Sequence, residues 1–539
     1  MGHSWGLGIG FFVLAVFSIL SLSFSFGYSE VVEGTVLING KSAIGITDSD
    51  FICATLDWWP FDKCDYGTCS WDHASLLKLD LSNAILLNAI KAFSPLKIRL
   101  GGTLQDVLIY ETEHQTQPCL PFVRKDREVF HYSQGCLPLS RWDELNAFFK
   151  KSGVVIIFGL NALYGRRPSH PNVPWNSTNA ESFIRYTVKK GYTIHGWELG
   201  NELSGHGVGV SIPADLYASD TIRLHNIVQI IYKDVEAKPL IIGPGGFFEA
   251  DWFKEYVDKT HNSLDVITRH IYNLGPGNDE HLVEKILDPS FLDGEASIFS
   301  QLLSLLKNSG TSVNSWVGEA GGSYNSGRNH VSNAFVNSFW YLDQLGMSAK
   351  YGTKTYCRQS LIGGNYGLLN ITSFVPNPDY YSALLWHRLM GRNVLATSFS
   401  GTKKIRAYAH CAKQSKGITL LLINLDGKTS AKVIVDYNGT VMEHSRHRDD
   451  HSLRMRAFLV PQIYEAEAKS REEYHLTAKN GDIQSQIMLL NGKELGVDSS
   501  GQIPSLQPQF VSSLEPITVA PFSIVFAHIP YVFQPACKA

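Results

Sequence analysis

Apolar runs of strand length alternate with amphipathic stretches along the first two thirds of the chain. The apolar runs predict strands at 51–56, 96–100, 154–160, 194–199, 240–242, 264–268, 315–317 and 353–356. Helical spacing between and after them predicts helices at 76–92, 139–151, 180–190, 215–234, 251–260, 298–308, 329–345 and 380–391. This alternation is typical of a parallel sheet wrapped by helices. We therefore expect an α/β fold, a (β/α)8 TIM barrel spanning residues 51–393.

The pattern changes to short alternating strands from residue 394 onward. Strands are predicted at 405–409, 417–424, 431–436, 472–477, 485–490 and 517–528, separated by Gly, Asn and Pro turns. They indicate a C-terminal all-β sandwich over residues 394–539. The alternating segment 31–46 is expected to join it, which assigns residues 30–50 to the same domain. Residues 441–469 interrupt the pattern with Arg and His, and we expect an insertion loop there. An anionic-ligand patch and a metal site are the alternatives.

The N-terminus has the features of a targeting segment. A short polar start with His3 precedes an apolar run from Gly6 to Phe26, and residues 27–29 are small or polar. We interpret residues 1–29 as a signal peptide, with a membrane anchor as the alternative. Three N-glycosylation triplets begin at Asn176, Asn370 and Asn438. We expect a secretory route to the cell wall or extracellular space, or to the lysosome or vacuole, with peripheral membrane or cell-wall association as an alternative.

The eight cysteines agree with an oxidising compartment. They show neither paired CxxC spacing nor an adjacent histidine cluster, so no metal site is expected from them. Cys119 with Cys136, and Cys411 with Cys537, are the predicted disulfides. Cys357 lies inside an apolar run and is expected to be a buried free thiol.

Composition narrows the class of partner. A formal net charge of -3 and a sequence pI near 6.7 provide no general attraction to nucleic acid or to anionic membranes. Nucleic-acid binding is therefore not expected. Eleven Trp and 23 Tyr suit stacking on sugar faces, although most such rings fill the core of any large barrel.

Two stretches, Trp197–Leu203 and Trp316–Gly322, each place a carboxylate after a brief apolar run and beside glycines. Because both follow barrel strands, Glu202 and Glu319 are predicted to share one end of the barrel, where such folds keep their chemistry. A pair of facing carboxylates can cleave a glycosidic bond. Glu198 competes with Glu202, but it lies inside the strand and is the better candidate for a salt bridge.

Several longer motifs occur in an order that resembles glycoside hydrolase family 79, in particular its plant heparanase-like proteins and baicalin-type β-glucuronidases. They are Ala54–Asp57, Arg99–Thr103, the two glutamate motifs, Arg358–Gln359, Gly363–Gly367 and Pro376–Tyr381. The resemblance extends from about residue 51 to the C-terminus, apart from the 441–469 interruption.

The resemblance implies a role for each matching residue. Glu202 would be the acid/base and Glu319 the nucleophile. The other residues would bind substrate: Asn201 at the sugar 2-hydroxyl, His270 and Tyr272 on the nucleophile's side, Asp57 and Thr103 at the pocket floor, and Gln359, backbone amides around Gly364, and Tyr366 at the glucuronate carboxylate.

These observations predict a retaining β-glucuronidase that needs no cofactor and releases terminal glucuronic acid from glycans or small glucuronides. Residues 243–260 carry only two lysines against several acids, so a highly sulfated chain would be poorly held. Endo-cleavage of an acidic polysaccharide and a non-catalytic glycan-binding role are the alternatives. The mechanism predicts an acidic pH optimum.

Overall fold

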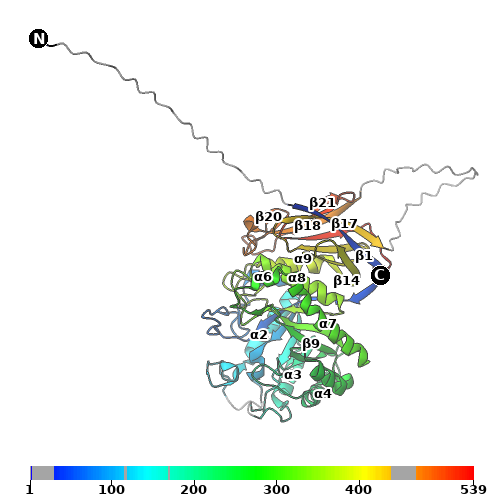
Figure 1. Ribbon diagram of the computed structural model, residues 1–539. Coiled ribbons are helices and arrows are strands. Elements are labelled where there is room, and N and C mark those ends of the chain that lie inside the picture. Colours follow the sequence, from blue (N-terminus) through cyan, green and yellow to red (C-terminus); the bar gives the residue numbers. More distant parts are fainter. Residues whose placement is uncertain (1, 3–29, 114–117, 168–169, 439–468, 539) are drawn as a thin grey trace, which may run out of the picture.

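The computed structural model describes residues 2, 30–113, 118–167, 170–438 and 469–538. It comprises a helix-wrapped barrel and an all-β region that lies beside the barrel, against its outer helices (Figure 1). The segments 3–29 and 439–468, which include the expected signal peptide and most of the expected insertion, lie outside the described residues. Among the described helices, none is both long and apolar enough to cross a bilayer.

Eight parallel strands form the closed barrel, as the sequence predicts. In chain order they are β2 (Ile52–Asp57), β3 (Lys97–Gly101), β6 (Val155–Leu160), β7 (Gly196–Leu199), β8 (Leu240–Gly246), β9 (Val266–Ile271), β11 (Asn314–Ala320) and β13 (Tyr356–Arg358). Each strand pairs with the next, and β13 closes the barrel against β2. The strands read as apolar runs because helices cover their outer faces and side chains fill the barrel.

The described helices are α1 (Ala84–Lys91), α2 (Leu139–Ser152), α3 (Thr178–Lys189), α4 (Ala214–Ile231), α5 (Ala250–Thr260), α6 (Leu282–Ile286), α7 (Pro289–Asn308), α8 (Phe335–Lys350) and α9 (Pro378–Leu389). The helix predicted at 76–92 is wrong over its first eight residues. Asn83 caps α1 by accepting the N–H groups of Ile85 and Leu86, which fixes the start of the helix there. Leu76 and Leu79 are buried from the preceding turns instead.

The all-β region is one continuous eleven-stranded sheet in the described chain. Its strands are β1 (Glu30–Ile46), β14 (Met390–Ser400), β15 (Ile405–Ala412), β16 (Ile418–Asn424), β17 (Thr429–Asn438), β18 (Ser470–Ala478), β19 (Met488–Leu490), β20 (Lys493–Glu494), β21 (Gln509–Ser512), β22 (Ile517–Val519) and β23 (Ser523–Ile529). The N-terminal strand β1 lies between β14 and β17. The predicted strand 517–528 is instead two, β22 and β23, which pair with different neighbours.

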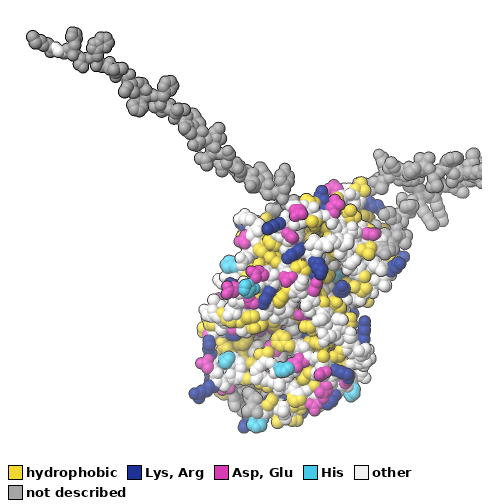
Figure 2. All heavy atoms as spheres, in the orientation of Figure 1, with side chains coloured by type: hydrophobic (Ala, Val, Ile, Leu, Met, Phe, Trp, Pro, Cys, Tyr) yellow, Lys and Arg dark blue, Asp and Glu magenta, His cyan; other side chains and the backbone are white. Residues whose placement is uncertain are grey.

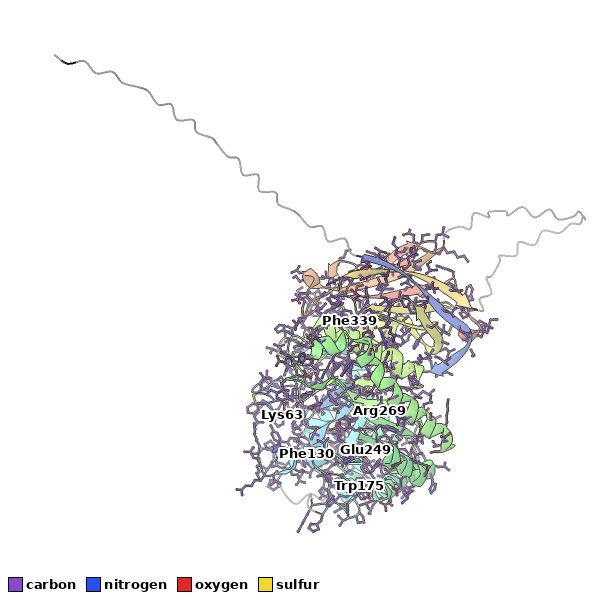
Figure 3. The ribbon with its side chains drawn as sticks, in the orientation of Figure 1. Lys63, Phe130, Trp175, Glu249, Arg269 and Phe339 are labelled. Carbon is purple, nitrogen blue, oxygen red and sulfur yellow. A yellow bond between two sulfur atoms is a disulfide. The ribbon has the colours of Figure 1, made fainter. Side chains whose placement is uncertain are left out.

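Strand β16 shows how the sheet joins the barrel. All seven of its residues are buried, because both faces of the strand are covered. Leu420 and Leu422 face a core made within the sheet, whereas Leu421 and Ile423 belong to the large core that includes the barrel. Helices α8 and α9 form the layer between barrel and sheet (Figure 1). Phe339 of α8, labelled in Figure 3, contacts Phe522 of the all-β region.

Four disulfides use all eight cysteines. The two predicted pairs, Cys119–Cys136 and Cys411–Cys537, are bonded. The expectation of a free thiol at Cys357 is wrong, because Cys357 bonds to Cys53. The two cysteines lie directly opposite each other on β13 and β2, where the barrel closes. No local sequence pattern could have predicted this pairing, because it depends on the register of closure. The fourth bond joins Cys64 to Cys69 in the loop after β2.

The three predicted glycosylation sites lie in different settings. Asn176 is exposed, just before α3, and Asn370 is half-buried in the loop before α9. Asn438 is the last residue of β17, and the rest of its triplet lies outside the described residues.

Candidate active site

Glu202 follows β7 in a tight turn at the carboxyl end of the barrel. Its φ of 55° lies in the left-handed region, which a residue with a side chain adopts at an energetic cost. Two backbone hydrogen bonds stabilise the turn: the Glu202 N–H donates to the Gly245 carbonyl at 2.6 Å, and the Glu202 carbonyl accepts the Val208 N–H at 2.7 Å. The turn directs a nearly buried carboxyl group into the barrel mouth.

Glu319 is the penultimate residue of β11, rather than lying beyond the strand end as the sequence suggested. One side-chain oxygen of Glu319, one of Glu202 and a ring nitrogen of His270 all lie within 4.8 Å of one another. Retaining glycosidases hold their two carboxyl groups about 5 to 5.5 Å apart, and inverting enzymes about 6.5 to 9.5 Å. The close approach of Glu202 and Glu319 fits the retaining arrangement.

Arg99 of β3 connects the acidic groups. It is 1% exposed, and its guanidinium donates to Glu198, to Glu319 and to the side-chain oxygen of Asn201 at 2.5, 2.8 and 2.9 Å. Glu198 also accepts a hydrogen bond from the Thr268 hydroxyl. Its contact with Arg99 is the buried salt bridge that is expected of Glu198 from the sequence. Since arginine stays charged, it fixes the position of Glu319 and offsets its charge.

Glu202 and its partner His270 have displaced pKa values. Burial raises the pKa of Glu202 to about 7, although the charge of Arg99 opposes the rise. Burial lowers the pKa of His270 to about 4, so its imidazole is neutral in all but acidic solution. The 2.9 Å contact between His270 Nδ1 and Glu202 Oε1 is therefore a hydrogen bond rather than an ion pair. An imidazole protonated on Nδ1 donates to Oε1 and leaves Oε2 to carry the acidic proton.

The family resemblance implies that His270 and Tyr272 both line the side of Glu319, but the two side chains hydrogen-bond different carboxyl groups. The Tyr272 hydroxyl donates to Glu319 Oε1 at 2.5 Å. His270 instead hydrogen-bonds Glu202, and its Nε2 is buried without a hydrogen-bond partner among the described residues. Each carboxyl group thus has its own aromatic neighbour, and the unpaired ring nitrogen of His270 remains free to accept a hydrogen bond.

Three predicted residues meet where β13 and β2 close the barrel. The Gln359 amide donates to Asp57 at 2.9 Å and its oxygen accepts the Thr55 hydroxyl. Burial first, and then the charge of Glu319, raises the pKa of Asp57 well above its ordinary value. Burial, with the charges of Asp57 and Glu319, also raises the pKa of Tyr366, which interacts with Gln359. This corner therefore presents a carboxyl group with a raised pKa, an amide and a phenol.

The glycine positions around this corner have separate structural reasons. A Cβ on Gly102 would lie 1.9 Å from an Asp57 carboxyl oxygen, and its φ of 91° also favours glycine. Thr103 follows it, half-buried at the start of a short 3-10 turn. The expectation that the Gly364 amide receives an anion is wrong, because that N–H donates to the Ser70 carbonyl at 2.8 Å. The next amide, of Asn365, donates to Ser326.

Sequence reasoning missed Asp106, which anchors the turn that carries Glu202. Its carboxyl accepts the backbone N–H of Asn201 and of Ala162, each at 2.7 Å. Burial raises the pKa of Asp106 to about 7 against these two hydrogen bonds. No spacing signal marks it, since it lies in a turn after β3. The sequence could have pointed to Arg99, because it is a charged residue in a largely apolar strand, but it has no role of its own in the sequence analysis.

Glu202, His270 and Glu319 also offer metal-ligating atoms. Both oxygens of Glu319 are already engaged, one by Arg99 and the other by Tyr272. A cation at this point would meet the fixed positive charge of the guanidinium. The cluster is therefore better suited to acid–base and nucleophilic chemistry than to holding a metal.

Comparisons with known proteins agree with this geometry. The model of glycosyl hydrolase family 79, N-terminal domain, matches residues 33–346. The chain is 60% identical to heparanase-like protein 3 of Arabidopsis thaliana, covering 97% of this chain and 98% of the relative. It is 43% identical to baicalin-beta-D-glucuronidase of Scutellaria baicalensis, covering 95% of each.

The fold also matches a solved 4-O-alpha-L-rhamnosyl-beta-D-glucuronidase of Fusarium oxysporum, with a TM-score of 0.61 and 14% identity over 92% of this chain and all of the other. The barrel, its paired carboxylates and these matches lead to one conclusion: the chain belongs to glycosyl hydrolase family 79 and is a glycoside hydrolase.

Proposed function

We propose that the protein is a retaining β-glucuronidase that removes terminal β-linked glucuronic acid. The observation that carries the proposal is the approach of Glu202 and Glu319 at the mouth of one barrel, each held by a different partner. The similarity to a protein named as a glucuronidase over 95% of the chain supports the choice of sugar.

In the first step, Glu319 attacks the anomeric carbon and forms a covalent glycosyl ester. Arg99 and Tyr272 hold its two oxygens, so the carboxylate needs no reorientation before attack. Protonated Glu202 gives its proton to the departing glycosidic oxygen. A pKa of about 7 keeps this proton in place in mildly acidic solution.

In the second step, ionised Glu202 takes a proton from water as the water attacks the anomeric carbon from the side the leaving group vacated. The ester bond to Glu319 breaks, and the sugar leaves with its original anomeric configuration. Neutral His270 donates to Glu202 through Nδ1 in both steps, which keeps the carboxyl group oriented. Asn201 is held by Arg99 and by Asp106, and we assign it to the sugar 2-hydroxyl.

The corner of Asp57, Gln359 and Tyr366 is the proposed site for the glucuronate carboxylate and neighbouring hydroxyls. The Gln359 amide and the Tyr366 phenol are uncharged hydrogen-bond donors, which can bind an anion without a salt bridge. Arg358 lies next to it in the chain but is fully buried, with its guanidinium bonded to Asp379. Recognition of the sugar acid therefore depends on the amide and the phenol, not on a free cation.

Exo action on a single terminal sugar is favoured over endo action on a polyanionic chain. Residues 203–212 and 247–249, which follow β7 and β8 at the barrel mouth, contain no Lys or Arg. On the face of the molecule shown in Figure 2, basic and acidic side chains are interspersed. A long acidic polysaccharide would need a row of cations along its binding groove. Product size distinguishes the two modes: free glucuronic acid indicates exo cleavage, and oligosaccharides indicate endo cleavage.

The test is a panel of aryl β-glycosides that differ only at C6, measured with the wild type and with Glu319→Ala. We expect preference for the carboxylate over the hydroxymethyl compound, and a loss of several orders of magnitude in the variant. Equal turnover by Glu319→Ala would remove the assigned nucleophile. Preference for the hydroxymethyl sugar would remove glucuronate as the substrate.

A secretory location is part of the proposal. Four disulfides require an oxidising compartment during folding, and exposed Asn176 is accessible to glycosylation. Expression of the full chain in plant cells, followed by fractionation and N-glycan removal, tests this. We expect glycosylated protein in the wall, the medium or the vacuole. Unglycosylated protein in the cytosol would contradict it.

A further inference from the structure

Several partly exposed apolar side chains border the active site near Glu202. Glycone-binding residues come from β2 and β13, whereas the acid/base follows β7, so a leaving group departs toward the loops after β7 and β8. Phe247 follows β8 directly and is 39% exposed. Its ring centroid lies 6.3 Å from that of His270 and 6.4 Å from that of Tyr272, the two rings that contact the catalytic carboxyl groups.

Two further apolar side chains border the Glu202 loop. Val208 is 39% exposed, and its N–H bonds to the Glu202 carbonyl. A Cβ on Gly209 would lie 3.2 Å from the ring of Phe130, which places that ring against the same loop. Phe130 is labelled in Figure 3. A Cβ on Gly246, the residue before Phe247, would lie 3.5 Å from the Glu202 Cα, so Phe247 also adjoins this loop. We refer to Phe130, Val208 and Phe247 as the apolar wall.

Charge around the apolar wall disfavours an acidic leaving group. Neither 203–212 nor 247–251 contains Lys or Arg, and the second carries Glu249 and Asp251. His206 is the one basic residue of these two segments, and its Nδ1 is already paired with Glu249 at 2.7 Å. The nearby stretch 124–128 has three basic and two acidic residues, with Arg124 paired to Asp126. A polyanionic chain would find little attraction here.

We infer that the apolar wall binds an aromatic aglycone, and that Phe247 determines this preference by stacking on it. The inference rests on the proposed function, since it names the class of glucuronide that the site prefers. An exposed aromatic ring beside the acid/base gains contact area only with a flat apolar partner. Such a partner would sit between Phe247 and the loop that carries Glu202.

The test compares wild type, Phe247→Ala and Phe247→Trp on 2-naphthyl and methyl β-glucuronide. The two substrates share the sugar, so the ratio of their kcat/KM values reports the effect of the aglycone. The chemical reactivity of each leaving group is the same for every variant, so it cancels when the ratios of two variants are compared. We expect the ratio to fall about tenfold in Phe247→Ala, mainly through KM, and to persist in Phe247→Trp. Phe510→Ala is the matched control, because Phe510 is 71% exposed on β21 in the all-β region.

Three outcomes would overturn the inference. An equal fall in kcat/KM on both substrates would mean that Phe247 only supports His270 and Tyr272, and no change on either substrate would mean that no aglycone stacks there. With a glucuronic-acid disaccharide as a third substrate, a loss confined to the disaccharide would assign the wall to a sugar. If the wild type cleaves another sugar's glycosides instead, the proposed function fails, and the naphthyl and methyl glycosides of that sugar still test the wall.

Discussion

The guanidinium of Arg99 lies 2.8 Å from a carboxylate oxygen of Glu319, although the two residues are 220 positions apart in the chain. The same guanidinium contacts Glu198, and the three side chains form a buried acid–base–acid cluster. Arg99 thus holds the proposed nucleophile, Glu319, and pairs with Glu198 at the same time. Because Glu198 is engaged in this ion pair, Glu202 is the glutamate of the 197–203 motif that is left for acid–base chemistry.

Glu198→Gln and Glu202→Gln form a matched pair of conservative changes. Glu198→Gln removes a charge that is paired inside the protein, so we expect a marked fall in melting temperature; breaking a buried pair costs about 3 to 5 kcal/mol. Glu202→Gln should keep the wild-type melting temperature and lose roughly 10² to 10⁴ in kcat. Calorimetry measures the melting temperature of both variants, and steady-state kinetics measures their kcat. A stable but inactive Glu198→Gln together with a destabilised but active Glu202→Gln would show that Glu198, not Glu202, is the acid/base.

The pH profile follows from the state of Glu202. Its pKa of about 7 means that the acidic proton is present below that pH and is lost above it. We therefore expect kcat/KM to fall about tenfold per pH unit above 7, while the acidic side stays active. In Glu202→Gln the alkaline limb should vanish. A rate that stays flat from acidic to mildly alkaline pH would contradict the assignment.

Tyr366→Phe tests recognition of the sugar acid. The phenol hydroxyl lies with Gln359 and Asp57, and a hydrogen bond to a charged group contributes about 1.5 to 3 kcal/mol. We expect the kcat/KM ratio of aryl glucuronide to aryl glucoside to fall about tenfold or more. Tyr192→Phe is the control, because its hydroxyl bonds Asp143 away from the barrel mouth. A ratio that the two variants change equally would rule out the role.

The two unpredicted disulfides should contribute unequally to stability. Cys53–Cys357 links residues 304 positions apart, whereas Cys64–Cys69 links residues five apart. In the chain-entropy account a longer loop gives more stabilisation, so the double Ala variant of the first pair should lose about 2 to 4 kcal/mol and the second less. Thermal unfolding under non-reducing conditions compares them. A larger loss for the Cys64–Cys69 pair would contradict the barrel-closure role.

The sequence supports prediction of the barrel better than of its contacts. Each buried strand is an apolar run of its own, so all eight strands could be located. The predicted ends of strands and helices were less accurate. Leu76 and Leu79 have helical spacing, for example, but they lie in the turns before α1, and their side chains are buried there. Cys53 meets Cys357 only because the barrel closes in one register. His270 could be placed at the site from the sequence. That it hydrogen-bonds Glu202 rather than Glu319 depends on side-chain geometry, which no local sequence pattern reveals.

Covalent trapping tests the central claim most directly. A 2-deoxy-2-fluoro-β-glucuronyl fluoride should react with the enzyme, and the slowed second step should leave the sugar attached to its nucleophile. Mass spectrometry of the proteolysed protein then locates the bond. The account predicts a single labelled peptide with the sugar on Glu319, and a label on any other residue would contradict it.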